Sequence, residues 1–367
     1  MASKVYFTNF CTGNSETLPQ KLARLIMTAG IDQIDFQDKF VAIKIHFGEL
    51  GNMAHLRSGY ARVLVDIIKD LGGKPFLTDC NTLYIGSRKN ALDHIETAYL
   101  NGFTPYSTGC HVIIADGLKG TDDIAVPVVG GEYVKEAKIG RAVMDADIVI
   151  SLNHFKGHEN AGFGGALKNL GMGCGSGEGK REMHDTCRPQ VDADKCVACG
   201  SCADICAHGA PNLADGVMHI DSSKCAGCGR CLHVCPVDAV HASDDQANTL
   251  LNYKIAEYAK AVVDGRPHFH ISLVRDVSPC CDCHAENDIP IVPDVGMFAS
   301  FDPVALDLAC AEAVNAQSIN PGSALDKANR PDLDNITGSF PESNWRSQIA
   351  HGKKIGLGED SYELITI

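Results

Sequence analysis

One cysteine spacing occurs twice in the middle of the chain, and this repeat limits the possible folds more than any other feature. The pattern is C-x2-C-x2-C-x3-C, at Cys196, Cys199, Cys202 and Cys206 and again at Cys225, Cys228, Cys231 and Cys235. Three closely spaced thiolates can wrap one iron-sulfur cube, while the fourth cysteine, one helical turn further on, reaches the other cube. The spacing therefore predicts two 4Fe-4S clusters with crossed ligands.

The crossed arrangement assigns each cluster three cysteines of one copy and the last cysteine of the other. The first set is Cys196, Cys199, Cys202 and Cys235, and the second is Cys225, Cys228, Cys231 and Cys206. The segment from Gln190 to Ser243 resembles a bacterial two-cluster ferredoxin. Structural zinc is the alternative, but zinc sites usually take paired C-x2-C ligands instead of doubled four-cysteine runs.

Composition and charge set the class of protein and its compartment. The chain has 367 residues, 17 of them cysteines, and a net charge of -14 without a run of basic residues, which disfavours nucleic acid as a partner. Neither a signal-peptide pattern nor a membrane-length apolar run is present. We therefore expect a cytoplasmic protein without a membrane partner, in which clustered cysteines bind metal because disulfides are rare in the cytoplasm.

Outside the cysteine-rich segment, apolar runs of strand length alternate with segments of helical periodicity. Such alternation predicts an α/β fold with a mostly parallel sheet layered with helices. The predicted strands are 4–7, 40–47, 74–78, 111–115, 147–153 and 268–274, and the predicted helices are 18–29, 60–71, 91–101, 253–264 and 303–316. We expect a small α+β ferredoxin-like insertion at 190–243 that interrupts an α/β domain formed by 1–189 and 244–367. Asp302-Pro303 is typical of a helix start.

Polar and ligand-type residues follow several of the predicted strands. Parallel strands present their carboxyl ends at one edge of the sheet, where ligands usually bind. We expect a crevice there, formed by the segments 46–49, 79–82, 154–158 and 275–284. His46, His154 and His158 are the predicted proton donors, and Lys44, Lys156 and Lys168 are predicted to hold an anionic substrate. A solvated loop after a strand is the alternative for 154–158.

The segment 157–179 contains nine glycines in 23 residues. This density lets the backbone approach a ligand or another chain closely and offers N–H groups to anions or sulfur. A glycine-rich loop that only turns is the alternative. Neither a phosphate-binding lysine motif nor a dinucleotide-binding glycine motif is present, so nucleotide binding is not predicted.

Three long blocks of sequence surround the cysteine-rich insert. They read TDCNTLYIGSRKNALDH, SLNHFKGHENAGFGGALKNLGMGC and CDCHAENDIPIVPDVGMFASFDPVALD. Together with the insert, they resemble the iron-sulfur members of the domain-of-unknown-function 362 family over nearly the whole chain. The resemblance implies a ferredoxin-like redox protein of anaerobes. It matches the family's CDC element at Cys281, Asp282 and Cys283, with Cys280 as an extra cysteine.

The CDC element stands at the end of a predicted strand, far from the doubled motif. Alternate residues on an extended loop can present both sulfurs to one metal, so we predict a third metal or cluster site formed by Cys174, Cys281 and Cys283. His184, Cys280 or a substrate would supply the remaining ligand. A redox-active thiol pair and inert structural cysteines are the alternatives. Asp282 is expected to satisfy loop N–H groups.

These patterns favour an oxidoreductase in which the clusters connect an external electron donor to the α/β crevice. The alternatives are a non-enzymatic electron carrier whose α/β part docks a partner protein, and a sensor that responds to oxygen through cluster loss. The expected partners are a redox protein or a small anionic substrate, and a homodimer is compatible with the sequence. Neither the substrate, the cluster potentials nor the presence of a flavin follows from these patterns.

Overall fold

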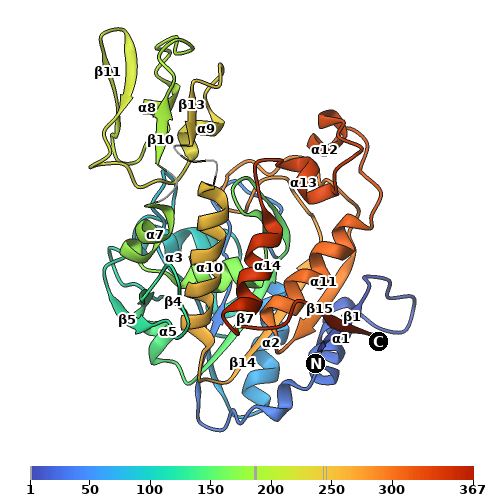
Figure 1. Cartoon of the computed structure of the whole chain (residues 1–367). Coiled ribbons are helices and arrows are strands. Elements are labelled where there is room, and N and C mark those ends of the chain that lie inside the picture. Colours follow the sequence, from blue (N-terminus) through green and yellow to red (C-terminus); the bar gives the residue numbers. More distant parts are fainter. Residues whose placement is uncertain (1, 186–187, 243, 245) are drawn as a thin grey trace.

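The centre of the molecule is one eight-stranded, mostly parallel sheet (Figure 1). The computed structural model describes residues 2–185, 188–242, 244 and 246–367. Only β15 runs against its neighbours, because it pairs antiparallel with both β1 and β14. In spatial order the strands are β16 (Tyr362–Thr366), β1 (Ser3–Thr8), β15 (Gly296–Ser300), β14 (His268–Val274), β7 (Ile148–His154), β2 (Phe40–Lys44), β3 (Lys74–Asp79) and β4 (Val112–Ile114). The expected α/β class is confirmed.

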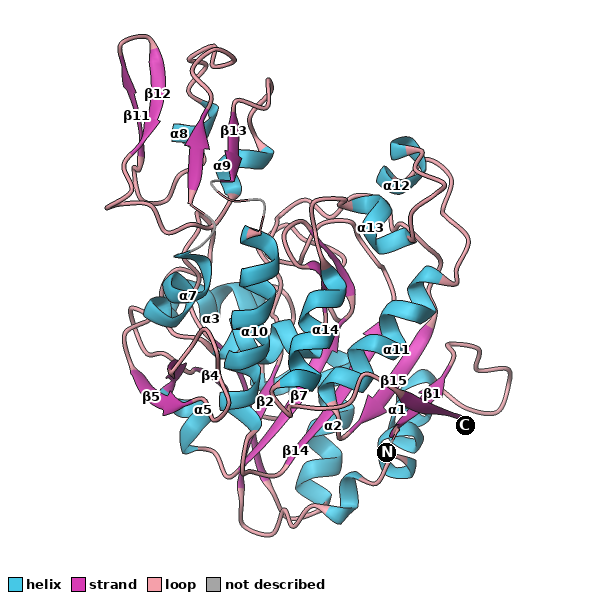
Figure 2. Ribbon diagram, in the orientation of Figure 1, coloured by secondary structure: helices cyan, strands magenta, loops and turns pink. Residues whose placement is uncertain are grey.

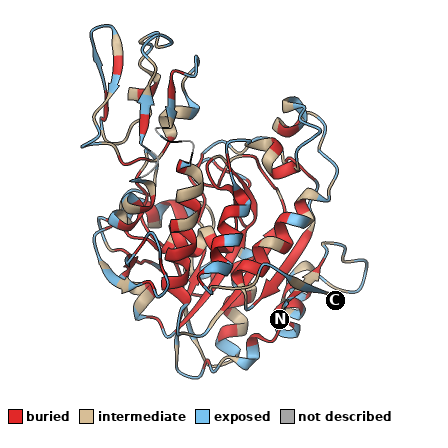
Figure 3. Cartoon of the chain, viewed as in Figure 1, coloured by how far each residue is buried: buried red, intermediate tan, exposed pale blue. Residues whose placement is uncertain are grey.

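Helices cover both faces of this sheet, so its central strands are buried on both sides (Figure 3). Along β7, Ile148, Ile150 and Leu152 belong to one apolar core, whereas Val149 belongs to the other. This alternation follows from the period of two along a strand. One face carries α1 (Leu18–Thr28), α2 (Ser58–Asp70) and α3 (Ala91–Leu100); the other carries α6 (Ala166–Cys174), α10 (Ala247–Val263), α11 (Pro303–Asn315) and α14 (Trp345–Lys354).

All six predicted strands and all five predicted helices form, with small shifts at their ends. As expected, Asp302 caps α11, where its carboxylate accepts hydrogen bonds from the backbone N–H groups of Val304 and Ala305 at 2.8 and 2.9 Å. Among the elements around the sheet, β15, β16, α6 and α14 were not predicted from the sequence. The remaining short elements are η1 (Ile31–Gln33), α4 (Pro105–Thr108), β5 (Asp123–Pro127), β6 (Glu136–Gly140), α5 (Arg141–Asp145), α12 (Ala324–Ala328) and α13 (Asn335–Ser339).

The cysteine-rich segment projects from the end of the main body near α7 and α10 (Figure 2). The chain leaves the main body after α7 (Gly177–His184) and re-enters it at α10, so strands from both sides of this segment build the large sheet. Within the segment, β10 (Pro189–Val191) pairs with β13 (Val240–Ala242), and β11 (Pro211–Ala214) forms a hairpin with β12 (Val217–Ile220). The short helices α8 (Ser201–Asp204) and α9 (Arg230–His233) complete it.

The glycine-rich segment 157–179 is not a loop that only turns, which was the alternative for this composition. It forms the hairpin of β8 (Lys156–His158) and β9 (Gly162–Gly164), then α6 and the start of α7. A Cβ on Gly171 would lie 2.1 Å from the carbonyl oxygen of Ile255 in α10. Two helices can approach this closely only where one has no side chain, so Gly171 serves the packing of α6 on α10.

No helix among the described residues is both long and apolar enough to span a membrane.

Candidate functional site

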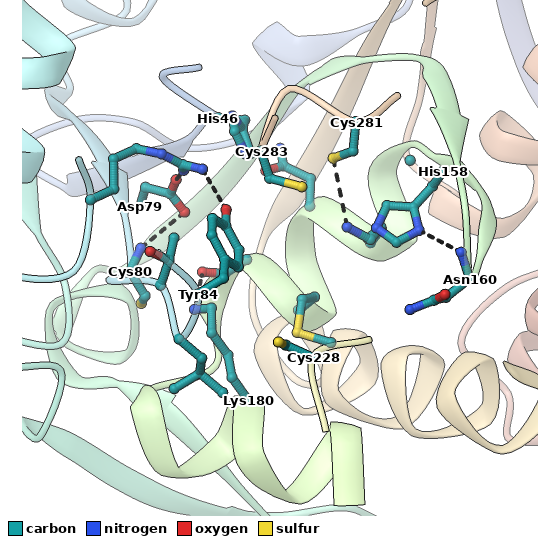
Figure 4. Close-up of a pocket in the computed structure, with 18 of the residues that line it drawn as sticks. His46, Asp79, Cys80, Tyr84, His158, Asn160, Lys180, Cys228, Cys281 and Cys283 are labelled. Atoms are coloured by element: carbon teal, nitrogen blue, oxygen red, sulfur yellow. Dashed lines mark hydrogen bonds and ion pairs between the residues drawn. The ribbon is translucent and has the colours of Figure 1, made fainter. Parts of the chain in front are cut away.

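The carboxyl ends of β2, β3 and β7 and the loop after β14 meet around one cavity (Figure 4). The cavity contains about 990 Å³ not filled by protein atoms, including its opening to solvent. Every histidine and lysine predicted to act at the site lines it: Lys44, His46, His154, Lys156, His158 and Lys168. The rule for parallel sheets therefore located the crevice correctly from sequence.

Two cysteines of the CDC element are buried in the wall of this cavity. Cys281 and Cys283 are 1% and 9% exposed, and each has its sulfur within 4.8 Å of the other and of a ring nitrogen of His158. The ammonium of Lys168 lies 3.8 Å from the Cys281 sulfur. The side chains of His158, Cys281 and Cys283 are close enough to one another to hold a metal ion. Gly157 allows the approach, because a Cβ there would lie 2.4 Å from the carbonyl oxygen of Pro279.

The sulfurs of this pair influence each other's ionisation. A hydrogen bond from Cys281 is the main cause that holds the pKa of Cys283 well below its usual value. The same hydrogen bond and burial raise the pKa of Cys281 to about 12. His284, whose Nε2 lies 3.0 Å from a carboxylate oxygen of Glu159, adds positive charge beside Cys283. These contacts favour a negative charge on Cys283 over one on Cys281.

Asp282 fixes the loop to the end of β7. Its carboxylate accepts a hydrogen bond from Nδ1 of His154 at 2.9 Å and forms an ion pair with Lys156 at 3.2 Å. Burial acts to raise the pKa of Asp282, but the charges of His154 and Lys156 outweigh burial and hold it well below its usual value. We expected Asp282 to satisfy loop N–H groups; instead it binds two side chains of the neighbouring strand end.

The ring nitrogens of the three predicted proton donors are used differently. His154 is held at both nitrogens, since Nε2 also lies 2.8 Å from the carbonyl oxygen of Arg275. In His158, Nδ1 accepts the backbone N–H groups of Asn160 and Ala161 at 3.1 and 3.2 Å, which leaves Nε2 for other contacts. Burial lowers the pKa of His158 to about 4 and that of His46 well below its usual value. His158 and His46 are therefore neutral at neutral pH.

Carboxylates pair with two of the three predicted substrate-binding lysines. Lys44 forms a buried ion pair with Asp79 at 2.9 Å, and Lys156 pairs with Asp282. Arg88 is also buried, and it contacts Asp79 at 3.4 Å and Glu49 at 3.2 Å. These cations are already balanced, so they contribute little net charge to the cavity.

Two lysines in the cavity have no carboxylate within ion-pair distance among the described residues. The Lys168 ammonium contacts the sulfur of Cys281. Lys180 is 7% exposed, and its ammonium donates to the carbonyl oxygens of Gly173 and Gly175. His184 also lines the cavity, and its buried Nδ1 has no hydrogen-bond partner. Arg230 also lines the cavity without an ion pair to a described carboxylate, so the positive charge available to a ligand comes from Lys168, Lys180 and Arg230.

Cys174 does not join Cys281 and Cys283, contrary to our prediction of a third site. It is the last residue of α6, is fully buried, and packs in the apolar core beside Cys80, whose sulfur donates to the Cys174 carbonyl oxygen at 3.3 Å. Helical geometry turns this side chain into the core. His158 takes the place that we expected Cys174 to occupy.

The eight cysteines of the doubled motif gather into two sets, in the crossed combination that the spacing predicts. One small cavity is lined by Cys196, Cys199, Cys202 and Cys235, and a second by Cys206, Cys225, Cys228 and Cys231. No described cysteine forms a disulfide. Backbone N–H groups point at the sulfurs of Cys206, Cys225 and Cys235 at 3.4, 3.4 and 3.2 Å. Four thiols around one space, with N–H donors to sulfur, suit a 4Fe-4S cluster.

The second cysteine set adjoins the main cavity, because Cys228 lines both spaces. In Figure 4, Cys228 enters the cavity from a different side than Cys281 and Cys283. Arg230 donates from Nη2 to the carbonyl oxygen of Cys283 at 2.8 Å, and its guanidinium stacks 4.9 Å from the ring centre of Tyr84. The cysteine-rich segment is thus attached directly to the CDC loop.

Sequence analysis missed four residues that shape this site: Tyr84, Arg88, Lys180 and Arg230. The first two lie in the block TDCNTLYIGSRKNALDH, whose polar start after a strand was a usable signal. Arg88 binds the Tyr84 hydroxyl at 2.6 Å. Lys180 and Arg230 could not be found in this way, since only the folding of distant segments brings them to the cavity.

Comparison with known proteins gives a family and two remote structural neighbours. A search of curated proteins finds no match. Among solved structures, a Thermotoga maritima protein from a structural genomics programme has 12% identity and a TM-score of 0.40, covering 80% of this chain and 57% of its own. The lactate racemase apoprotein of Thermoanaerobacterium thermosaccharolyticum has 10% identity and a TM-score of 0.41, covering 87% and 58%. The chain thus spans under two thirds of either protein.

A family model described as a domain of unknown function, DUF362, matches residues 41–312, which include the strand ends, the cysteine-rich insert and the CDC loop. This chain belongs to the DUF362 family.

Proposed function

We propose that the protein is an iron-sulfur oxidoreductase that brings single electrons into the cavity beside the CDC loop. The observation that carries the proposal is the position of Cys228, which belongs to one set of four cysteines and also lines the main cavity. A ligand cysteine in the cavity wall places a redox group next to any bound substrate.

Cys196, Cys199, Cys202 and Cys235 would hold one 4Fe-4S cluster, and Cys206, Cys225, Cys228 and Cys231 would hold the other. When bound, such clusters supply and accept one electron at a time. We infer that the first cluster accepts electrons from outside, because Cys199 is exposed and Val197 beside it is 62% exposed. The acidic net charge of -14 favours a redox partner protein with a basic surface.

The residues of this chain would bind and orient a small anionic substrate. Lys168, Lys180 and Arg230 supply the positive charge, since carboxylates balance Lys44 and Lys156. His158 presents Nε2 as a fixed N–H donor, because backbone N–H groups occupy its Nδ1. His154 holds the CDC loop through Asp282 and is not available as a proton donor.

The first test measures iron and acid-labile sulfide in anaerobically purified protein. We expect about eight irons per chain, from two clusters of four. Cys199→Ser and Cys228→Ser should each lose about half of the iron. Zinc in place of iron would reject the proposal.

The second test measures oxidation of a reduced one-electron dye in the presence of a panel of small carboxylates. Lys168→Gln and Lys180→Gln should reduce acceptor-dependent oxidation at least tenfold and keep the iron content. Lys224→Gln is the control, because Lys224 is exposed and forms only a surface ion pair with Asp221. Rapid electron exchange between the dye and the clusters, without oxidation that depends on any acceptor, would instead support an electron carrier that docks a partner.

A further inference from the structure

We propose that Cys281 and Cys283 form a redox-active dithiol, which cycles to a disulfide and passes electron pairs to a small anionic disulfide bound in the cavity. This inference rests on the proposed function, because the two clusters would supply the electrons. The Cys281–Cys283 pair would collect two electrons from the clusters, and the substrate would be a small anionic disulfide.

The position of the two sulfurs supports a pair that can bond. Both sulfurs lie within 4.8 Å of one nitrogen of His158 and of each other, in the wall of the cavity. One residue separates the two cysteines, so a disulfide between them would close a small ring. Strained disulfides are reduced more easily than structural ones, and they are the type that serves in catalysis.

The hydrogen bonds of His158 argue for a thiol pair over a metal ion. A histidine that binds metal through one nitrogen almost always donates an N–H from the other. Here Nδ1 of His158 faces two backbone N–H groups, from Asn160 and Ala161, and a backbone amide can only donate. The ring proton therefore lies on Nε2. In this state His158 donates a hydrogen bond and does not act as a ligand.

The surroundings of the pair favour a thiolate that can attack another sulfur. Lys168 lies 3.8 Å from the Cys281 sulfur, and Arg230 donates to the backbone carbonyl of Cys283. Cationic neighbours stabilise a thiolate and make a cysteine reactive. Cys280 differs, since it does not line the cavity and is not part of the His158 group.

The cycle balances in atoms and electrons. A low-potential donor protein gives two single electrons through the clusters, and these electrons break the bond between the sulfurs of Cys281 and Cys283. Two protons from water complete the two thiols. One of the two sulfurs, as thiolate, then attacks a sulfur of the substrate and releases the first substrate thiol. The second cysteine displaces the other substrate thiol, and the protein disulfide forms again.

The cavity fits a disulfide with carboxylate groups better than a neutral one. Lys168, Lys180 and Arg230 line the cavity and have no ion pair with a carboxylate among the described side chains. An anionic substrate would pair with these cations, whereas a neutral disulfide would leave them without a charged partner in the cavity wall.

The test maps thiols in intact, cluster-loaded protein under anaerobic conditions. Wild type and Cys280→Ser are treated with oxidised glutathione, alkylated and digested. The mass of the peptide containing Cys281 and Cys283 is then measured by mass spectrometry. We expect both cysteines to become resistant to alkylation and the peptide to lose two hydrogens. Cys280→Ser should behave as wild type, since Cys280 lies outside the pair.

A second measurement separates this inference from the proposed function. A reduced one-electron dye should reduce the disulfide to two thiols in Cys280→Ser. The same reduction should be at least tenfold slower in the double variant that combines Cys280→Ser with Cys228→Ser. If the disulfide forms but the dye reduces it at the same rate in both proteins, the dithiol is supported and the proposed electron route is overturned.

Two results would overturn the dithiol. One is equal alkylation of Cys281 and Cys283 before and after oxidation. The other is a bound metal ion that protects both thiols until a chelator removes it.

Discussion

The carboxylate of Asp282 accepts a hydrogen bond from Nδ1 of His154 at 2.9 Å, which ties the CDC loop to the end of the central strand β7. The other ring nitrogen of His154 faces the carbonyl oxygen of Arg275 at 2.8 Å, so this histidine contacts the same loop at two points, its first residue and Asp282. The two cysteines that flank Asp282 are therefore held against β8 by a buried charged contact.

Asp282→Asn should destabilise the α/β part by about 3 kcal/mol, because it leaves the buried ammonium of Lys156 without a charged partner. The measurement is thermal unfolding under anaerobic conditions, followed by fluorescence of Trp345, the only tryptophan, which is 2% exposed. Asp276→Asn is the control. Asp276 pairs with Arg275 nearer the surface, so its loss should cost less than about 1 kcal/mol. Equal effects would show that Asp282 does not anchor the loop.

Gly171→Ala should destabilise the protein by about 3 kcal/mol, because its Cβ would meet the backbone of α10 at 2.1 Å. Gly173→Ala should cost less, about 1 kcal/mol, since its Cβ would meet the movable end of Lys44 at 2.6 Å. Gly59→Ala in α2 is the control, with no atom within 4 Å and an expected change below about 1 kcal/mol. The same unfolding assay ranks the three variants. A milder effect at Gly171 than at Gly173 would contradict the close packing of α6 on α10.

Glu257 should contribute stability that depends on pH. Burial acts to raise its pKa, but hydrogen bonds from His351 and from the backbone N–H groups of 132–134 outweigh burial and lower it. The contribution of a carboxylate with a lowered pKa is complete above its unfolded pKa, about 4.3, and is lost as the pH falls through the folded pKa.

Glu257→Gln should therefore cost about 2 kcal/mol at pH 7, and the difference from wild type should shrink below about pH 4. Unfolding midpoints of both proteins across this range test the prediction. Both proteins would carry the same clusters, so acid loss of clusters affects both alike. A difference that grows on acidification would mean that Glu257 is not held ionised by these contacts.

Arg230→Met should loosen the cysteine-rich segment from the CDC loop, because it removes the hydrogen bond to Cys283 and the stacking on Tyr84. We expect unchanged iron content but electron delivery into the cavity at least threefold slower. Lys195→Met is the matched control, as Lys195 is exposed and pairs only with Asp192. Stopped-flow reduction of an acceptor by the prereduced protein measures the rate. An unchanged rate in Arg230→Met would remove Arg230 from the electron route.

Patterns that are local in the chain predicted most of the fold. Strand and helix periods located every predicted element, because burial on one or both faces of an element imposes a repeat on neighbouring residues. For the glycine-rich segment, local patterns left open whether the glycines allow a close backbone approach or only a turn. Glycine at 171 and 173 indicates a loop by local propensity, whereas the real cause is the approach of α10 and Lys44 from elsewhere in the chain.

The sequence by itself determined the cavity's location, since strand ends in a parallel sheet must meet at one edge. It also determined how the eight cysteines group, because a three-residue spacing carries the fourth sulfur away from the first three. Only the tertiary structure decided which residues accompany the CDC pair. His158 and Lys168 replace Cys174 there, because the turn of α6 buries the cysteine while β8 brings the histidine to the cavity. Contacts between segments more than a hundred residues apart depend on packing, which no local pattern records.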